Sequence, residues 1–213
     1  MIISVVQQKG GVGKTTISLH LAMGLHLRGF KTALIDADEQ RSASYWSAKR
    51  GEAAAFPVMS MAKATLHREL LQLADSFDFI IIDGPPRHSE ILRSAMAASD
   101  LALIPVKASS FDVWAASEVI KVVREIQTVK PAMKAAFVIN ELRPNTRLAR
   151  DIRAALTAQE TPVLDAAVHL RQAFSVAVGR GLTVFESEPS GKASEDMNSV
   201  ITEVIQLLKE DEQ

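Results

Sequence analysis

Short apolar runs alternate with amphipathic stretches along the whole chain. Five runs are rich in aliphatic and β-branched residues and are bounded by Gly, Pro or charged residues, as buried strands are: 2–6, 32–35, 79–82, 101–106 and 135–139. Weaker strands are indicated near Val58 and Val163. The intervening stretches predict helices over 15–28, 41–49, 63–73, 90–97, 113–128, 147–159, 171–178 and 194–208. This alternation predicts an α/β fold, with a doubly wound, mostly parallel sheet and helices on both faces.

The composition is that of an ordinary globular protein. Its 213 residues suffice for one well-buried core, so we expect a single domain over residues 1–213. The sequence has no Cys, which excludes disulfides, iron–sulfur clusters and a Cys nucleophile. The N-terminus lacks the basic region of an export signal, and no apolar run reaches the length of a membrane span. We therefore expect a cytoplasmic protein.

A glycine-rich segment follows the first predicted strand. The run 7–16 reads QQKGGVGKTT and leads directly into an apolar-periodic helix. Glycines let backbone N–H groups converge on phosphate oxygens, and the positive end of the helix dipole lies at the same point. Lys14 is placed to reach the β- and γ-phosphates, and the Thr15 hydroxyl to coordinate Mg²⁺. The order of strand, loop and helix predicts a nucleotide site, although Gln8 occupies the first Gly position of the general P-loop pattern.

The run KGGVGKT from Lys9 to Thr15 resembles the deviant Walker A motif of the ParA/MinD superfamily of P-loop NTPases. The resemblance covers nearly the whole chain and is closest to the small ParF-like plasmid-partition ParA proteins. It implies that Lys9 reaches across a dimer interface to the nucleotide of the facing subunit, whereas the residues alone leave open that Lys9 is a solvated loop residue. The resemblance also implies that ATP is bound by Lys9, Gly10, Gly11, Val12, Gly13, Lys14, Thr15, Thr16 and Asn140.

Acidic residues follow two of the predicted strands. Asp36 and Asp38 lie at the sheet edge where doubly wound folds bind ligands. Their segment resembles the family's D-x-D-P-Q switch, with Glu39 in place of Pro, which implies that Asp38 orients the attacking water and Asp36 supports the Mg²⁺ shell. Either one taken singly could instead cap the following helix. Asp83, at the exit of strand 79–82, is expected to hold Mg²⁺ through water. The implied catalytic residues are Lys9, Lys14 and Asp38, and the implied metal-binding residues are Thr15, Asp36 and Asp83.

Further segments resemble motifs of the same family. The run 84–86 resembles the start of its switch II, and 104–112 resembles a segment beside the nucleotide and the dimer face, with Ala108 in the position of a Pro. Asn140 matches the position where relatives hydrogen-bond the adenine, and an amide can pair with both donor and acceptor edges of a base. A turn residue at a strand end is the alternative for Asn140.

The resemblance implies a cycle that involves a homodimer, DNA and a partner. ATP closes a sandwich dimer that binds DNA without sequence preference, so that the protein is nucleoid-associated while ATP-bound. A ParB-like centromere-binding protein then stimulates an otherwise slow ATP hydrolysis and releases the dimer, which moves a plasmid, a chromosome region or another cargo. Such DNA binding needs Lys or Arg contacts to phosphates. The candidates are Arg171 and Arg180, followed by Lys130, Arg147 and Arg150, although each could be an ordinary surface cation.

Two other functions stay open. A MinD-like membrane cycle is suggested by the apolar residues of the predicted helix 194–208. The acidic residues that follow would be repelled by anionic lipid, and a core-packing helix explains the same stripe, so no stable membrane association is expected. A metabolic P-loop ligase of the dethiobiotin synthetase type would share the fold and the nucleotide site. It would turn over with its small-molecule substrate alone, whereas a positioning ATPase waits for DNA and its partner.

Overall fold

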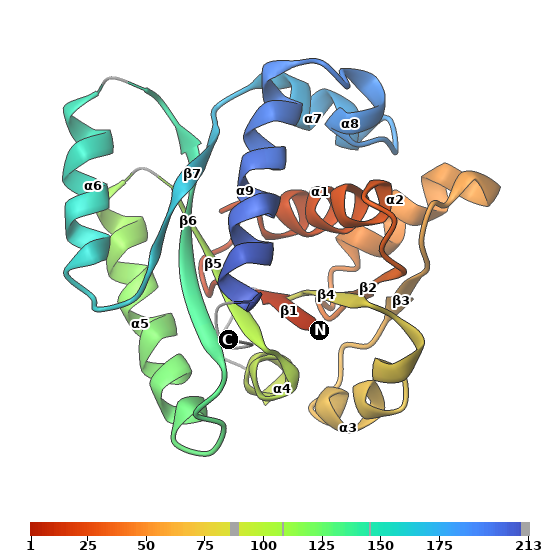
Figure 1. Ribbon diagram of the computed structural model, residues 1–213, viewed down its shortest axis with the longest axis horizontal. Coiled ribbons are helices and arrows are strands. Elements are labelled where there is room, and N and C mark those ends of the chain that lie inside the picture. The colour runs from red at the N-terminus through yellow and green to blue at the C-terminus, as the bar shows by residue number, and fades with distance from the viewer. Residues whose placement is uncertain (86–89, 108, 145, 210–213) are drawn as a thin grey trace.

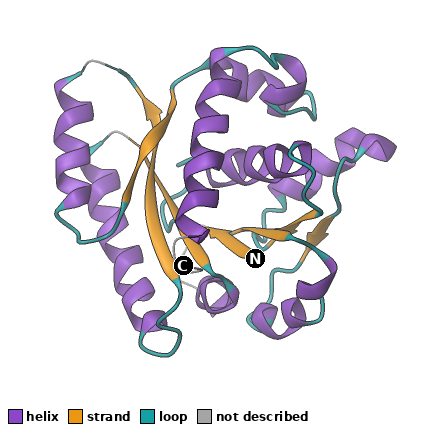
Figure 2. Ribbon diagram, in the orientation of Figure 1, coloured by secondary structure: helices purple, strands orange, loops and turns teal. Residues whose placement is uncertain are grey.

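A single parallel sheet organises the chain. The computed structural model describes residues 1–85, 90–107, 109–144 and 146–209. In these residues seven strands pair in the order β3-β2-β4-β1-β5-β6-β7, and every neighbouring pair is parallel (Figure 1, Figure 2). The strands are β1 (Ile2–Val5), β2 (Thr32–Asp36), β3 (Val58–Ser60), β4 (Phe79–Asp83), β5 (Leu101–Lys107), β6 (Lys134–Leu142) and β7 (Val163–His169). The doubly wound α/β prediction is confirmed, including the two weakly indicated strands.

Helices cover both faces of the sheet (Figure 1). One face carries α1 (Lys14–Leu27), α2 (Ser42–Arg50), α7 (Gln172–Gly179), α8 (Val184–Ser187) and α9 (Lys192–Lys209). The other carries α3 (Leu66–Leu71), α4 (Glu90–Ala98), α5 (Ser110–Gln127) and α6 (Arg147–Thr157). Two short 3-10 turns, Gly51–Ala53 and Ala74–Ser76, follow α2 and α3. The first face thus has one buried apolar cluster and the second has two, and both faces are covered as a parallel sheet requires.

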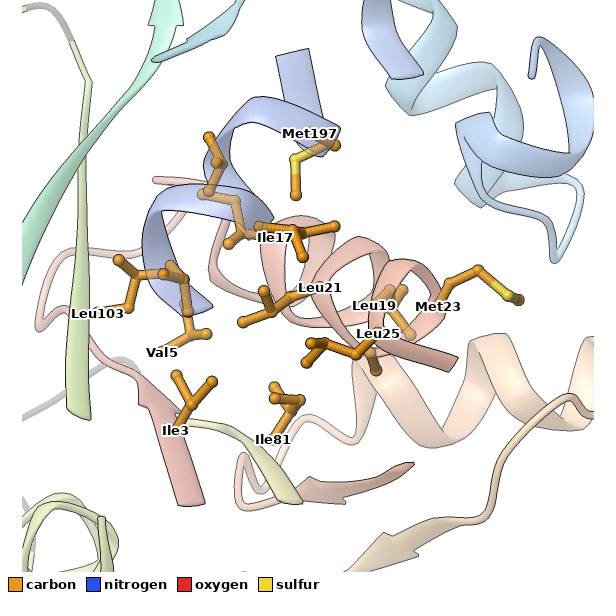
Figure 3. Packing of buried hydrophobic residues seen from close by; sticks show 14 of the residues in the cluster. Ile3, Val5, Ile17, Leu19, Leu21, Met23, Leu25, Ile81, Leu103 and Met197 are labelled. Atoms are coloured by element: carbon orange, nitrogen blue, oxygen red, sulfur yellow. The ribbon is translucent and has the colours of Figure 1, made fainter. Parts of the chain in front are cut away.

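Helix α1 is buried along most of its length because its sequence is apolar on nearly every side. Ile17 and Leu21 lie between Met197 of α9 and the sheet side chains Val5 and Ile81 (Figure 3). All five residues are at most 2% exposed. The packing holds the N-terminal end of α1 at a fixed place beside the carboxyl ends of β1 and β4, where the glycine-rich segment connects β1 to α1.

Three helices differ most from the sequence prediction. Helix α5 begins at Ser110, three residues before the predicted start. The helix expected over 63–73 begins only after Thr65, whose hydroxyl donates to the Glu69 carboxylate at 3.2 Å and does not cap the helix, and it ends at Leu71 in a turn. Helix α8 was not predicted, because a single turn is too short to display a 3.6-residue period. A capping box stabilises it, in which Glu186 accepts hydrogen bonds from the backbone N–H of Thr183 at 2.8 Å and from its hydroxyl at 2.9 Å.

The apolar stripe of the last helix is part of the core. In α9 the side chains of Val200, Ile201, Val204 and Leu208 are buried, and the helix packs on β7 and α1. The core-packing explanation of this stripe is confirmed. No helix among the described residues combines the length and apolar character needed to cross a membrane.

Candidate active site at the carboxyl edge of the sheet

The loop between β1 and α1 is open to solvent at Gly10 and Gly11 and tightly packed at Gly13. Gly13 has φ +94°, and a Cβ there would lie 2.2 Å from Nδ2 of Asn140. At Gly10 and Gly11 a Cβ would meet no atom within 4 Å. Gly13 is therefore required by conformation and by close approach. The open side at Gly10 and Gly11 is where a ligand can approach the loop backbone.

Lys14 begins α1 and is only 7% exposed. Burial lowers the pKa of its ammonium group, and the negative fields of Asp83 and Asp38 oppose that shift. Asp83 and Asp38 therefore lie close enough to Lys14 to act on its charge. No acidic residue stands in the first turn of α1, so the positive helix end is left for an external anion.

Asp83 is a fully buried carboxylate at the end of β4. One oxygen accepts a hydrogen bond from the Ser18 hydroxyl at 3.3 Å, and the Thr15 hydroxyl also bonds the carboxylate. Its Oδ2 has no hydrogen-bond partner among the described residues. Burial raises its pKa to about 7, and Asp36 adds to this, while Thr15, Lys14 and Ser18 counteract it. A buried carboxylate with a vacant acceptor beside a threonine hydroxyl suits a hard divalent cation.

Asp36 lies beside Asp83 in register, because β2 pairs with β4. It is fully buried, and its Oδ2 accepts hydrogen bonds from the backbone N–H and the hydroxyl of Ser44, both at 2.7 Å. Its Oδ1 accepts from the N–H of Asp38 at 3.3 Å. Asp36 thus accepts a hydrogen bond from a backbone N–H in the first turn of α2 that would otherwise be unpaired. This is the helix-capping role that the sequence left open for this residue. Support of a Mg²⁺ shell stays a prediction.

Asp38 lies in the turn between β2 and α2 and is partly exposed. Its Oδ1 accepts the backbone N–H of Gln40 at 2.9 Å, and its carbonyl accepts the N–H of Arg41 at 3.0 Å. Arg41 has φ 54°, which is where the chain turns into α2. Of the two carboxylates, Asp38 is the one that solvent reaches, as the predicted water-orienting residue must be.

Lys9 is held by an ion pair with Asp112 in the first turn of α5. The Nζ atom lies 2.9 Å from Oδ1 of Asp112, whose side chain is 3% exposed, whereas that of Lys9 is 42% exposed. This Oδ1 has no geometrically aligned hydrogen bond among the described residues, so the contact is electrostatic. The backbone N–H of Asp112 bonds the Ser109 hydroxyl at 3.3 Å, which caps α5 and fixes the acid. The lysine is therefore neither free nor buried.

Asn140 joins the end of β6 to the phosphate loop. Its Nδ2 donates to the carbonyl of Val12 at 2.7 Å, and the residue is 5% exposed. It also lines a hollow of about 460 Å³ together with Gly13 and Thr16 of the loop. The structure brings Asn140 to the phosphate loop and gives it a role in holding that loop. A contact with adenine stays a prediction.

The two arginines predicted to contact DNA lie at opposite ends of α7. Arg171 precedes the helix and is ion-paired with Asp196 of α9 at 2.7 Å. Arg180 follows the helix and is exposed. In the other quoted motifs, Gly84 approaches β1 so closely that a Cβ would lie 2.8 Å from the Val5 carbonyl oxygen. Pro86 and Ala108 lie outside the described residues.

Comparison with known proteins decides the family. The model of the CobQ/CobB/MinD/ParA nucleotide binding domain matches residues 3–184. The chain belongs to this family. It is a ParA/MinD-family P-loop ATPase, and the resemblance read from its motifs is confirmed.

Two named proteins resemble this ATPase in sequence over most of its length. "Maintenance of carboxysome distribution protein A" from Halothiobacillus neapolitanus is 32% identical over 208 residues, which cover 95% of each chain. "Protein virC1" from Rhizobium radiobacter is 28% identical over 181 residues, which cover 82% of this chain and 78% of that protein.

Solved structures of low identity share the fold of this ATPase. The complex of Cyanothece McdA(D38A) with ATP has a TM-score of 0.81 at 16% identity, covering 96% of both chains. MinD from Pyrococcus horikoshii with Mg-ADP has a TM-score of 0.78 at 20% identity, covering 97% of this chain and 96% of that chain. The predicted cofactors, ATP and Mg²⁺, agree with what these relatives hold. The residues of this site also fit ATP and Mg²⁺. Among the described residues, Oδ2 of Asp83 has no hydrogen-bond partner and is available to a cation, and the space beside Gly10 and Gly11 is open to phosphates.

Two serines of this ATPase's site were not predicted. Ser18 bonds Asp83, and Ser44 bonds Asp36. Ser18 carries a signal that could have identified it, because it lies three residues after Thr15 and so on the same face of α1. Ser44 carries none, since its partner lies eight residues earlier across a turn whose shape the sequence does not reveal.

Proposed function

We propose that the protein is an ATP hydrolase that dimerises on binding ATP, binds DNA without sequence preference and positions a large cargo with a ParB-like partner. The observation that carries this proposal is the place of Lys9. It lies at the edge of the phosphate loop, is almost half exposed, and is held by an ion pair with Asp112. A cation in that position can leave Asp112 for a phosphate of the facing subunit's nucleotide, and the nucleotide then becomes part of the interface.

The chain's own residues supply most of the hydrolysis machinery. Loop N–H groups and Lys14 bind the phosphates, and Thr15 and Asp83 would hold the cation. Mg²⁺, when bound, would neutralise negative charge that develops on the phosphate oxygens. Asp38 orients the water whose oxygen attacks the γ-phosphorus, so that the bond to the β-phosphate oxygen breaks and ADP leaves. Without the facing subunit's Lys9 this set lacks one cation, which is why hydrolysis is slow in the monomer.

DNA binding in this proposal comes from exposed cations. Arg180 is exposed, as are Arg147 and Arg150 on α6. Lys130 is less available, because its Nζ donates to the carbonyl of Ser99 at 2.7 Å. Contacts of this kind give binding that falls steeply with salt. We propose a large cargo without naming it, because the relatives point to two kinds. One relative bears the name of a carboxysome distribution protein, and the motifs resemble those of plasmid-partition proteins.

The alternatives differ in what they require. A membrane cycle needs an apolar surface to insert, and the stripe of α9 that suggested one is buried against β7 and α1. A small-molecule ligase needs no second copy of the chain for turnover. The association state with nucleotide therefore separates a positioning ATPase from a ligase.

The test is sedimentation velocity of the full chain with Mg²⁺ and a non-hydrolysable ATP analogue, or with ADP. The wild type is expected to be a dimer with the analogue and a monomer with ADP. Lys9→Ala is expected to bind the analogue and stay a monomer. The matched control is Lys121→Ala, because Lys121 also forms an ion pair, with Glu118 at 2.7 Å, and lies on α5 nine residues after Asp112. It should dimerise like the wild type.

The same samples test the DNA arm. The analogue-bound wild type should be retained on unrelated DNA sequences alike at low salt and lost as salt rises, whereas Lys9→Ala should not be retained. A wild type that remains a monomer with the analogue, or a Lys9→Ala variant that dimerises normally, would refute the proposal.

A further inference from the structure

A hollow of about 460 Å³ opens beside the phosphate loop. Gly13 and Thr16 form its loop side, Asn140 stands at the end of β6, and Arg171 and Phe174 stand on the side of α7. A nucleotide whose phosphates lie on the loop has this hollow next to it for its base and ribose. Pockets of this kind combine an apolar wall with a few fixed polar groups that orient the ligand.

Arg171 is one of those fixed polar groups. Its Nε donates to Oδ2 of Asp196 at 2.7 Å and its Nη2 to Oδ1 at 3.2 Å, so the guanidinium group is clamped by both carboxylate oxygens. Asp196 also accepts the backbone N–H of His169 at 3.1 Å and is 3.0 Å from its Nδ1. The carboxylate is thus built into the junction of β7, α7 and α9, with its side chain 9% exposed.

The charges in this cluster favour the ion pair. Burial alone would raise the pKa of Asp196, but the hydrogen bonds from Arg171 and His169 outweigh it and lower the pKa below its ordinary value. The same bond to Asp196 raises the pKa of Arg171. The arginine therefore stays where Asp196 places it, and among the described residues its Nη1 makes no hydrogen bond and no aromatic ring stacks on its planar group.

We propose that Arg171 holds the purine ring of the bound nucleotide and that Asp196 is its positioning residue. The inference rests on the proposed function, since it requires a nucleotide on the loop, and it assigns to Arg171 a role other than contact with DNA. A guanidinium group stacks on aromatic rings, and one that is already fixed loses little side-chain entropy when a ring arrives. Phe174 supplies the apolar part of the same wall and is 7% exposed.

The experiment compares two ligands that share the phosphates and differ in the base. Calorimetry on the full chain with Mg²⁺ measures the Kd of ATP and of inorganic tripolyphosphate, which occupies the loop without reaching the hollow. Arg171→Ala is expected to weaken ATP binding about tenfold and to leave tripolyphosphate unchanged. Arg171→Lys should not rescue ATP binding, because an ammonium group has no planar face. Asp196→Asn should give a smaller loss that is again confined to ATP.

Arg153→Ala is the matched control. Arg153 is ion-paired with Asp165 at 3.6 Å and donates to the carbonyl of Leu164 at 2.9 Å, but it does not line the hollow. It should leave both affinities unchanged. Equal losses for ATP and tripolyphosphate in Arg171→Ala would mean that the loop itself is damaged, and unchanged ATP binding with loss of DNA retention would make Arg171 a DNA contact. Either result overturns the proposal. A wild type that binds neither ligand would instead refute the proposed function.

Discussion

The buried imidazole of His20 should make the fold sensitive to acid. His20 lies on α1 and is fully buried. Its Nε2 accepts the backbone N–H of Val184 at 3.0 Å, so its Nδ1 must carry the proton and donate to the Thr16 carbonyl at 2.6 Å. Burial lowers its pKa from 6.5 to about 4, although the bond to Thr16 and the field of Glu186 act in the opposite direction. The neutral tautomer is the only form that satisfies both hydrogen bonds.

The sign and size of the effect follow from linkage. Below pH 6.5 the unfolded chain gains a proton on His20, while the folded protein stays neutral down to about pH 4. The unfolded state therefore binds more protons throughout this window, and the free energy of unfolding falls as the pH falls. The difference between the two pKa values corresponds to about 3 kcal/mol, lost almost entirely between pH 6.5 and 4.

Urea unfolding followed by circular dichroism at a series of pH values measures this loss, with His20→Gln as the comparison. Glutamine keeps one donor and one acceptor but does not titrate. All other titrating groups contribute equally to both proteins, so the difference between the two curves isolates His20. The wild type should lose about 3 kcal/mol more than the variant on going from pH 7 to pH 4. Curves that run parallel over this range would refute the buried neutral imidazole.

Two further predictions concern the phosphate loop and the metal site. Gly13→Ala should destabilise the protein by roughly 1–3 kcal/mol and remove ATP binding, because the new Cβ meets Asn140 in a left-handed backbone. Gly179→Ala, whose Cβ would meet no atom within 4 Å, should do neither in the same urea and binding assays. Asp83 has a folded pKa of about 7 against 3.8, so the nucleotide-free wild type should lose stability as pH rises through that window. Asp83→Asn should lack this loss and bind ATP without regard to Mg²⁺, and a variant with the wild-type pH profile would contradict the assignment.

The strands could be predicted because their signal is local. A buried parallel strand is apolar on both faces, so β4 and β5 stand out as short runs, and even the weak signals at Val58 and Val163 mark real strands. Helix ends were less certain, because they depend on caps and turns within one or two residues. Helix α8 has a capping box but only one turn. Its sequence signal is therefore the pair of capping residues, whereas the prediction relied on the periodicity of apolar residues.

The phosphate loop was predicted because its residues are consecutive and each has a fixed chemical task. What the sequence could not supply was the partner of each charged group. Lys9 meets Asp112, and Arg171 meets Asp196, over separations that no local pattern spans. The position of Arg171 in the chain suggested DNA, yet a carboxylate on the last helix binds it at the wall beside the loop.

The burial pattern indicates which parts of the site respond to a nucleotide. Helix α1 is packed on the sheet and on α9, so the end that carries Lys14 cannot shift without disturbing the core. Asp83 and Asp36 are fully buried and bonded by hydroxyl groups of α1 and α2. Lys9 is the charged group of the loop that is both exposed and held by a contact that a phosphate can replace. Because regions with few buried contacts are those that rearrange at low free-energy cost, a nucleotide should change this contact first and leave the loop's frame in place.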